Sequence, residues 1–140
     1  MEEVASLLAL SGDAARHLAD SEVFPYGPAG LRCRLLIENA HGAPEAARPI
    51  AMLGLAANNL LGDEVRRLLN LQSLLLADGL WYLGTSGEGE LQIMALRRYE
   101  TSRDIATAVN LAGLLGWTTL RILLAHDVSP GSAPADAGST

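Results

Sequence analysis

The residue types that carry most enzyme chemistry are few and scattered in this chain of 140 residues. There is one cysteine, Cys33, and there are three histidines, His17, His41 and His126, which lie in three separate segments. This separation gives no metal-ligand spacing and assigns no base to a Cys33 nucleophile. We predict that Cys33 is a small core residue and that the histidines are surface or half-buried groups.

A glycine-rich run at Gly84–Gly89 is the nearest approach to a phosphate-binding loop. It joins two predicted strands and no lysine follows it, whereas a phosphate loop leads from a strand into a helix. Glu88 and Glu90 flank the same turn and are predicted to be solvated. All ten basic residues are arginine, which excludes lysine nucleophiles and Schiff bases. The sequence therefore predicts no catalytic, metal-binding or cofactor-binding residues, and a protein that is not an enzyme.

Composition limits the partners that the protein could bind. A hydrophobic content of 49% indicates a folded chain, and 140 residues suit one domain. The net charge of −6 disfavours nucleic acid and anionic membranes. A single cysteine and an acidic N-terminus without a basic signal region predict a cytoplasmic protein. The longest uncharged stretch, Ile105–Leu120, is too short for a membrane span.

The stretch from Leu80 to Tyr99 organises the predicted fold. Leu80–Thr85 and Glu90–Tyr99 are predicted strands joined by a turn at Ser86–Gly89, because apolar residues fill both arms and glycines lie where the backbone reverses. A lone hairpin is marginal in water. We therefore expect further strands or helices to cover its apolar face.

Other strands are predicted before the hairpin. Leu31–Glu38 alternates in the manner of a strand with one solvated face, and its apolar face comprises Leu31, Cys33, Leu35 and Ile37. Val23 and Phe24 suit a short edge strand before Pro25.

The segment between Asn39 and Ala57 contains a predicted loop and an ambiguous element. Asn39–Arg48 is rich in glycine, proline and small residues and is predicted to be a loop. Pro49–Ala57 fits either a buried strand or a helix that begins at Pro49. We favour the strand because the hairpin needs partners.

Two helices are predicted in the first half of the chain and before the hairpin. Glu2–Asp20 has helical periodicity, and Ser11–Asp13 would divide it into two short helices if the helix breaks there. Asp63–Ala77 is predicted to be a helix capped by Asp63 and Gly79. Its predicted core-facing stripe consists of Val65, Leu68, Leu69, Leu75 and Leu76. Leu71 and Leu74 lie off that stripe and widen the apolar surface.

The last helix begins with a capping-box pattern at Thr101 and Asp104 and runs to His126. Its predicted buried face comprises Ile105, Ala108, Val109, Ala112, Leu115, Ile122 and Leu123. Leu114 and Trp117 interrupt the polar line on its other side, which fits either a wide helix packed on two neighbours or an exposed patch for a partner. We predict one domain over residues 1–126 and a disordered tail over 127–140.

This order of elements resembles the class I chaperones of type III secretion, the Tir-chaperone family. The most telling portion is LLNLQSLLLADGLWYLGTSGEGELQIMALRRY (Leu68–Tyr99), followed by a long amphipathic helix. The resemblance covers about residues 2–125. It implies an α+β homodimer in the order α-β-β-β-α-β-β-α, with a small antiparallel sheet covered by helices. The long loop at Asn39–Arg48 and the tail depart from the family pattern.

The resemblance also implies a role in virulence: a bacterial cytoplasmic chaperone that holds an extended N-terminal segment of a secreted effector until export. Strand edges would accept a strand from this client, and apolar pockets would fix its register. Client contact is expected at Val23, Phe24, Leu31, Cys33 and Leu35, and partner contact at Leu114 and Trp117. The dimer contact is expected at Val65, Leu68, Leu71, Leu74, Trp81 and Met94.

Two other classes fit parts of the sequence. One is a structural or regulatory subunit whose hydrophobic helices bind a folded partner within a larger assembly, such as a secretion apparatus. The other is a small enzyme that uses Cys33 or a histidine. A Cys33→Ala substitution separates the enzyme from the two non-catalytic classes, and for it we expect no enzymatic consequence.

Overall fold

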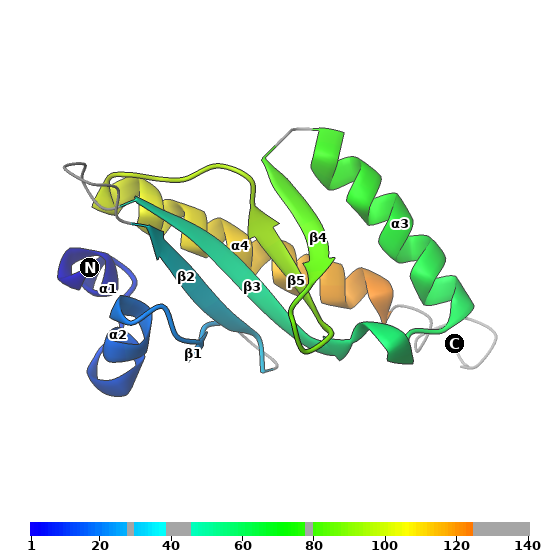
Figure 1. Ribbon diagram of the computed structural model, residues 1–140, viewed down its shortest axis with the longest axis horizontal. Coiled ribbons are helices and arrows are strands. Elements are labelled where there is room, and N and C mark those ends of the chain that lie inside the picture. Colours follow the sequence, from blue (N-terminus) through cyan, green and yellow to red (C-terminus); the bar gives the residue numbers. More distant parts are fainter. Residues whose placement is uncertain (28–29, 39–45, 78–79, 125–140) are drawn as a thin grey trace, which may run out of the picture.

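The computed structural model describes residues 1–27, 30–38, 46–77 and 80–124. These residues form one antiparallel sheet of five strands with helices around it, which confirms the predicted α+β class (Figure 1). The predicted order of elements is also confirmed, with the N-terminal helix divided in two, α1 (Glu2–Leu7) and α2 (Gly12–Ala19). Gly12 has a φ of +58° at the start of α2, a backbone conformation that glycine adopts without strain.

The sheet has the strand order β1-β2-β3-β5-β4, and every neighbouring pair is antiparallel. Its strands are β1 (Phe24–Pro25), β2 (Arg32–Glu38), β3 (Ala46–Ala56), β4 (Trp81–Thr85) and β5 (Glu90–Ala95). The predicted hairpin is therefore confirmed as β4 and β5. The second arm ends at Ala95 and not at Tyr99, although Tyr99 still forms an isolated bridge with Ala47.

Strand β3 resolves the ambiguous segment in favour of a strand. It begins earlier than predicted, at Ala46, so the loop prediction was wrong for residues 46–48 because these residues pair with the end of β2. The rest of the predicted loop, residues 39–45, lies outside the described residues. So do Gly79, His41, His126 and the predicted tail over 127–140.

Two longer helices complete the fold, α3 (Gly62–Ala77) after a short 3₁₀ turn (Ala57–Asn59), and α4 (Ser102–Leu123). Figure 1 shows α4 lying across the back of the sheet, α3 beside β4, and α1 and α2 beyond β2. The front face of the sheet has no helix over it. The molecule is thus a two-layer arrangement with one sheet face covered and one open.

The core lies between α4 and the covered face. A single row of paired residues crosses all five strands and is buried throughout: Phe24, Cys33, Ala51, Ile93 and Leu83. Ile105, Val109 and Leu123 of α4 are also buried in this core. The alternation predicted for Leu31–Glu38 is confirmed, since Leu31, Cys33 and Leu35 are each at most 1% exposed.

Helix α4 packs close to the sheet through small residues. A Cβ atom added to Gly116 would lie 3.1 Å from Leu31 Cδ1, 3.2 Å from Ala51 Cβ and 3.3 Å from Leu53 Cδ2. At Gly113 the nearest atom would be Tyr26 Cδ2 at 3.4 Å, which is ordinary contact. The Tyr26 hydroxyl donates a hydrogen bond to Asn110 Oδ1, so the segment after β1 is also fixed to the helix.

The start of α4 confirms the predicted cap, because the Asp104 N–H donates to Thr101 Oγ1 at 3.1 Å. The buried face of α4 was predicted correctly except at Ile122, which is 37% exposed. By length and composition α4 could span a membrane, yet half of its most apolar window is buried within the fold. A core helix of a globular protein meets the same criterion.

The predictions for α3 require correction. The helix begins at Gly62, and the Leu61 N–H donates to Glu64 Oε1 at 2.7 Å, so Glu64 closes the N-terminus in place of Asp63. Val65 and Leu69 are exposed, whereas Leu68, Leu71 and Leu75 pack against the core. The buried residues lie on a different side of α3 from the predicted stripe, because only the side that faces β4 and α4 is covered. The side chain of Leu76 lies outside the described residues.

The close approach of α4 gives a direct test. We expect Gly116→Ala to be at least about 1 kcal/mol less stable than Gly113→Ala, because the added methyl group at Gly116 meets three core atoms. Replacement of glycine by alanine also stabilises a helix interior by about 0.5–1 kcal/mol, and this contribution is the same in both variants. Urea unfolding of both variants measures the difference. Equal stability would show that the helix does not lie this close to the sheet.

Candidate polypeptide-binding surface

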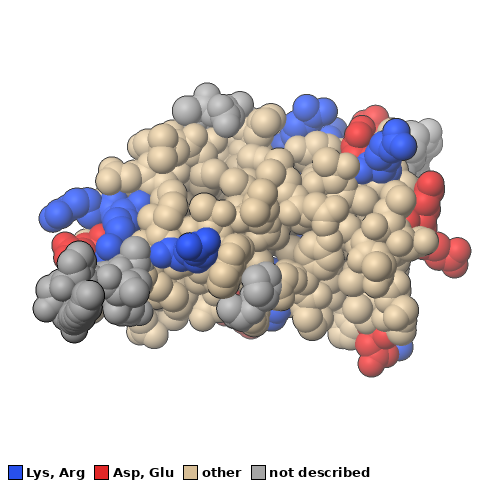
Figure 2. All heavy atoms as spheres, turned by 180° about the vertical axis from the view of Figure 1, so that it is seen from behind, with Lys and Arg blue, Asp and Glu red and all other residues tan. Residues whose placement is uncertain are grey.

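The outer side of α4 exposes large apolar residues in a line. Leu114 is 59% exposed, Leu111 39% and Ile122 37%. Figure 2 views this side of the molecule and shows charged side chains mainly toward its margins, with a broad uncharged area between them. A water-exposed helix face normally carries polar residues. Of the two interpretations that the sequence left open for Leu114, this surface agrees with the second, an exposed apolar patch.

An apolar groove of about 930 Å³ continues from this surface, between the second half of α4 and β3. Its lining includes Leu53, Leu55, Trp117, Leu120, Ile122 and Leu124. Arg121 is the one charged residue among the lining residues, and it is exposed at the surface. The groove can bind apolar side chains in extended or helical polypeptide, with a guanidinium group beside them.

A β-bulge forms the sheet side of this groove. The pairing of β3 with β5 shifts between Met52 and Ala56, and Gly54 within the bulge has a φ of +74°. The Gly54 N–H donates to Glu90 Oε2 at 2.7 Å, and the same carboxylate pairs with Arg32. Because the bulge bends β3, Gly54 and Leu55 are turned toward the end of α4, where they line the groove.

Helix α3 carries a second set of exposed apolar residues. Leu74 is 68% exposed, Leu61 and Leu69 are each 62% exposed, and Val65 is 40% exposed. Leu61, Val65 and Leu69 follow one another at intervals of four residues, so they lie along one side of the helix. Their exposure leaves this side of α3 available to a partner.

The same helix covers the free edge of β4. The Gln72 side chain accepts a hydrogen bond from the Leu83 N–H at 2.7 Å and donates one to the Leu83 carbonyl at 3.0 Å. Leu83 is the central residue of β4, and these backbone groups would otherwise be available to an added strand. Strand addition at this edge therefore requires displacement of Gln72.

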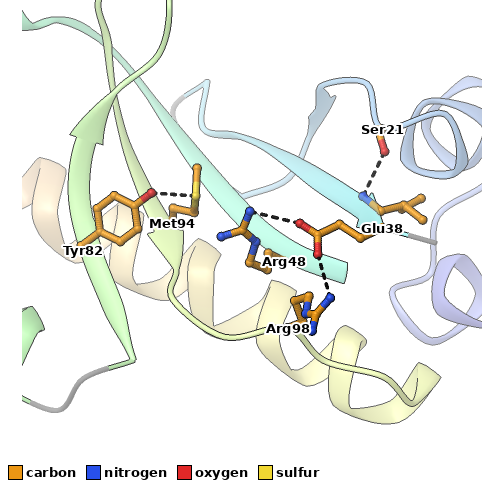
Figure 3. Close-up of polar contacts among 7 residues, drawn as sticks. Ser21, Glu38, Arg48, Tyr82, Met94 and Arg98 are labelled. Atoms are coloured by element: carbon orange, nitrogen blue, oxygen red, sulfur yellow. Dashed lines mark hydrogen bonds and ion pairs between the residues drawn. The ribbon is translucent and has the colours of Figure 1, made fainter. Parts of the chain in front are cut away.

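The opposite edge of the sheet is short. Strand β1 has two residues, one of which is Pro25, and proline has no N–H to donate. Beyond β1, the outer edge of β2 is contacted by Ser21, whose hydroxyl accepts from the Ile37 N–H at 3.2 Å (Figure 3). This edge is therefore partly occupied, and the expectation that strand edges receive a client stays a prediction.

The client-contact residues expected from the resemblance fall into two groups. Phe24, Leu31, Cys33 and Leu35 are buried in the core, so the expectation of direct client contact is wrong for these side chains. Their side chains lie on the sheet face that α4 covers, and this face is buried in the fold. Val23 is half-buried at the start of the edge strand. Leu114 and Trp117 lie on the outer side of α4 and at the groove, respectively.

The six residues expected at a dimer contact do not share one surface. Trp81 is 4% exposed in the core and is unavailable to a partner, which corrects the expectation for this residue. Leu68 and Leu71 pack inward, whereas Val65 and Leu74 face outward from α3. Met94 lies on the open face of the sheet, where the Tyr82 hydroxyl donates to its sulfur at 2.9 Å (Figure 3).

The described residues of these surfaces offer non-covalent contacts. Among the described residues, no group of three or more His, Cys, Asp or Glu side chains could hold a metal ion. Cys33 is buried, and burial raises the pKa of its thiol to about 12. Gly84–Gly89 is a hairpin turn, in which the Gly89 N–H donates to the Ser86 carbonyl at 2.9 Å.

Sequence reasoning missed Gln72, Gly54 and the groove. Gln72 falls by helical spacing within the predicted apolar stripe that contains Leu68 and Leu75, and a polar residue at that position was the available signal. Gly54 within an otherwise apolar strand was a signal of a bulge. The groove had no sequence signal, because the β3 residues that line it, Leu53–Leu55, are more than 60 residues before those at the end of α4, which begin at Trp117. No family model, curated protein or solved structure matches this chain.

Removal of the Gln72 amide should expose the edge of β4. We expect Gln72→Leu to destabilise the fold by about 1–3 kcal/mol, because two hydrogen bonds to Leu83 are lost. We also expect increased self-association through the uncovered edge. Chemical unfolding and light scattering measure the two effects. Ser73→Leu, an exposed neighbour on α3, is the matched control, and equal behaviour of both variants would refute the role of Gln72.

The buried thiol predicts a reactivity and a pH dependence. At pH 8 we expect Cys33 to react with a thiol reagent such as dithionitrobenzoate only after unfolding, because the reactive form is the thiolate. Above the ordinary pKa of 9.0 the unfolded chain releases the thiol proton, whereas the folded chain retains it up to about pH 12. Stability should therefore fall across this interval by at most about 1.4 kcal/mol per pH unit. The Cys33→Ala variant should not show this part of the stability loss at alkaline pH. Rapid labelling of the native protein by the thiol reagent would contradict the burial of Cys33.

Proposed function

We propose that the protein is a non-catalytic chaperone that binds an apolar segment of a client polypeptide, in the manner of a cytoplasmic secretion chaperone. The single observation that carries this proposal is the largely uncharged, apolar surface formed by the outer side of α4 and the adjoining groove. Leu114, Trp117 and Ile122 are the residues through which we expect contact. The agreement of the order of elements with that of class I type III secretion chaperones supports the proposal.

The proposed mode of binding is the insertion of side chains into the groove. Gln72 covers the centre of the β4 edge, and β1 is short and contains Pro25. Contact by main-chain strand pairing is therefore disfavoured. A client segment would instead lie against α4 and place apolar side chains between that helix and the β3 bulge. Each buried aliphatic side chain would contribute about 1.5–3 kcal/mol before the cost of ordering the segment.

The proposal extends to a homodimer and an effector client as the resemblance implies. The exposed leucines of α3 support a second contact, because Leu61 and Leu69 are each 62% exposed in the single chain. We expect this helix to contact the second subunit while α4 contacts the client. In this arrangement the two functions use different helices.

A second candidate is a subunit that binds a folded partner within a larger assembly. The covered strand edges favour it, because strand addition is the usual way to hold an extended segment. The exposed apolar residues lie on helices, and rigid helix faces suit a preformed partner surface. Preference for a folded partner over an unfolded client distinguishes this candidate from the chaperone.

Binding of an unfolded protein tests the proposal. The probe is fluorescently labelled, reduced and alkylated α-lactalbumin, and the measurement is fluorescence anisotropy. We expect the wild type to bind and Leu114→Ser combined with Ile122→Ser to raise Kd about tenfold, equivalent to about 1.4 kcal/mol. Both side chains are already partly exposed, so the fold should be retained.

The matched control is Leu7→Ser on α1, because Leu7 is 54% exposed but lies on a different helix. Its Kd should equal that of the wild type. Equal affinities of the Leu7 and the Leu114/Ile122 variants would refute the α4 surface. Failure of the wild type to bind any unfolded probe would refute the chaperone function and favour the assembly subunit.

A further inference from the structure

The open face of the sheet carries residues that the proposed function does not use. The register places Arg34, Ile50, Met94 and Tyr82 in one row across four strands. Arg32, Met52, Gln92 and Gly84 form the row on one side of it, and the pair of Leu36 with Arg48 lies on its other side. This face lies opposite α4, and Figure 1 shows no helix over it.

The composition of this face is unusual for a surface in contact with water. An open antiparallel face normally carries polar residues. Here the centre is formed by Ile50, Met52, Met94 and Tyr82, and arginines lie along the β2 side and at one end. Ile50 and Met52 are shielded to 3% and 8% exposure, although no helix covers them. Thioether and aromatic side chains adapt to varied apolar partners.

The charge of this face is opposite to that of the chain. Arg32, Arg34, Arg48 and Arg98 lie on the face or at its end, and the acidic residues beside them are Glu38 and Glu90. Four arginines and two glutamates leave a net charge of +2, whereas the whole chain carries −6. The remainder of the chain therefore carries −8.

The arginines retain donors for a ligand. Glu38 accepts from Arg48 at 3.1 Å and from Arg98 at 3.4 Å, so one carboxylate is shared by two guanidinium groups (Figure 3). Arg48 Nε is buried without a hydrogen-bond partner among the described residues. Arg34 donates from its Nε to the Ser21 carbonyl at 2.7 Å and is otherwise exposed. Each guanidinium has five N–H donors, and carboxylates match this geometry.

We propose that the open sheet face binds an acidic segment of a partner polypeptide, in which carboxylates alternate with apolar residues. Arg32 and Arg34 are two residues apart on one strand, so their side chains stand about 7 Å apart. Residues i and i+2 of an extended segment point to one side at the same interval, and the residues between them point to the opposite side. A segment lying along β3 would therefore direct carboxylates toward the arginines of β2 and apolar side chains toward Met94 and Tyr82. This inference rests on the proposed function in that the partner is a polypeptide, and it adds a second contact on the opposite side of the molecule.

The test uses the full chain and a labelled twelve-residue peptide of alternating glutamate and leucine. A second peptide has glutamine in place of every glutamate. We expect the acidic peptide to bind at least tenfold more tightly by fluorescence anisotropy, and its affinity to fall as salt is raised. The Arg34→Gln and Arg98→Gln double variant should lose at least tenfold in affinity. Both side chains are exposed and neither lies in the core, so the variant should fold.

The matched control is Arg66→Gln on α3, because Arg66 is exposed and pairs with Asp63 alone among the described residues, at 3.8 Å. It should bind the acidic peptide like the wild type. Equal binding of the two peptides, or equal loss in both arginine variants, would overturn the inference. So would tighter binding of a single-stranded oligonucleotide of twelve residues, or conversion of a dimer to a monomer by the double variant with peptide affinity unchanged.

The proposed function and this inference fail in distinguishable ways. Loss of α-lactalbumin binding in the Leu114→Ser and Ile122→Ser variant, without binding of the acidic peptide by the wild type, leaves the function standing and overturns the inference. Binding of the acidic peptide that depends on Arg34 and is unaffected by the α4 substitutions supports the inference even where the groove does not bind a client.

Discussion

The close contact between α4 and the back of the sheet is the constraint on which the rest of the structure depends. At Gly116 the helix approaches Leu31, Ala51 and Leu53 so closely that an added Cβ atom would lie within 3.3 Å of an atom of each residue. The helix combines small residues such as Ala112, Gly113 and Gly116 at this contact with larger buried residues at Ile105 and Leu123. Other apolar residues of the helix, including Leu114, lie outside this contact and are exposed to solvent.

The position of α4 also gives the molecule two different faces. The back combines the outer side of α4 with the groove at the β3 bulge and is largely uncharged. The front is the open sheet face, where arginines lie to one side of Met94 and Tyr82. Edges are less accessible than faces, because Gln72 covers the centre of β4 and Pro25 shortens β1. Polypeptide contact through faces follows from this geometry more readily than strand addition.

This arrangement changes how the resemblance to secretion chaperones applies to the chain. The order of helices and strands is the one that the sequence predicted, and the hairpin lies where it was predicted. The strand residues Phe24, Leu31 and Leu35 belong to the core, because the face of β2 that carries them is the one that α4 covers. Most of the exposed large apolar residues are on or next to helices α3 and α4. Proposals about partners therefore concern these helices and the open sheet face.

The sequence by itself determined the elements that depend on local chemistry. Turn glycines and apolar periodicity predicted the hairpin, Thr101 predicted the start of α4, and alternation predicted the buried face of β2. Tertiary structure decided which side of each helix was covered, since Val65, Leu69 and Ile122 continue a predicted apolar stripe but are exposed in the fold. It also decided the contact of Gln72 with Leu83 and the row from Arg34 to Tyr82. Periodicity specifies a stripe along one element, whereas strand register and helix placement depend on residues far apart in the chain.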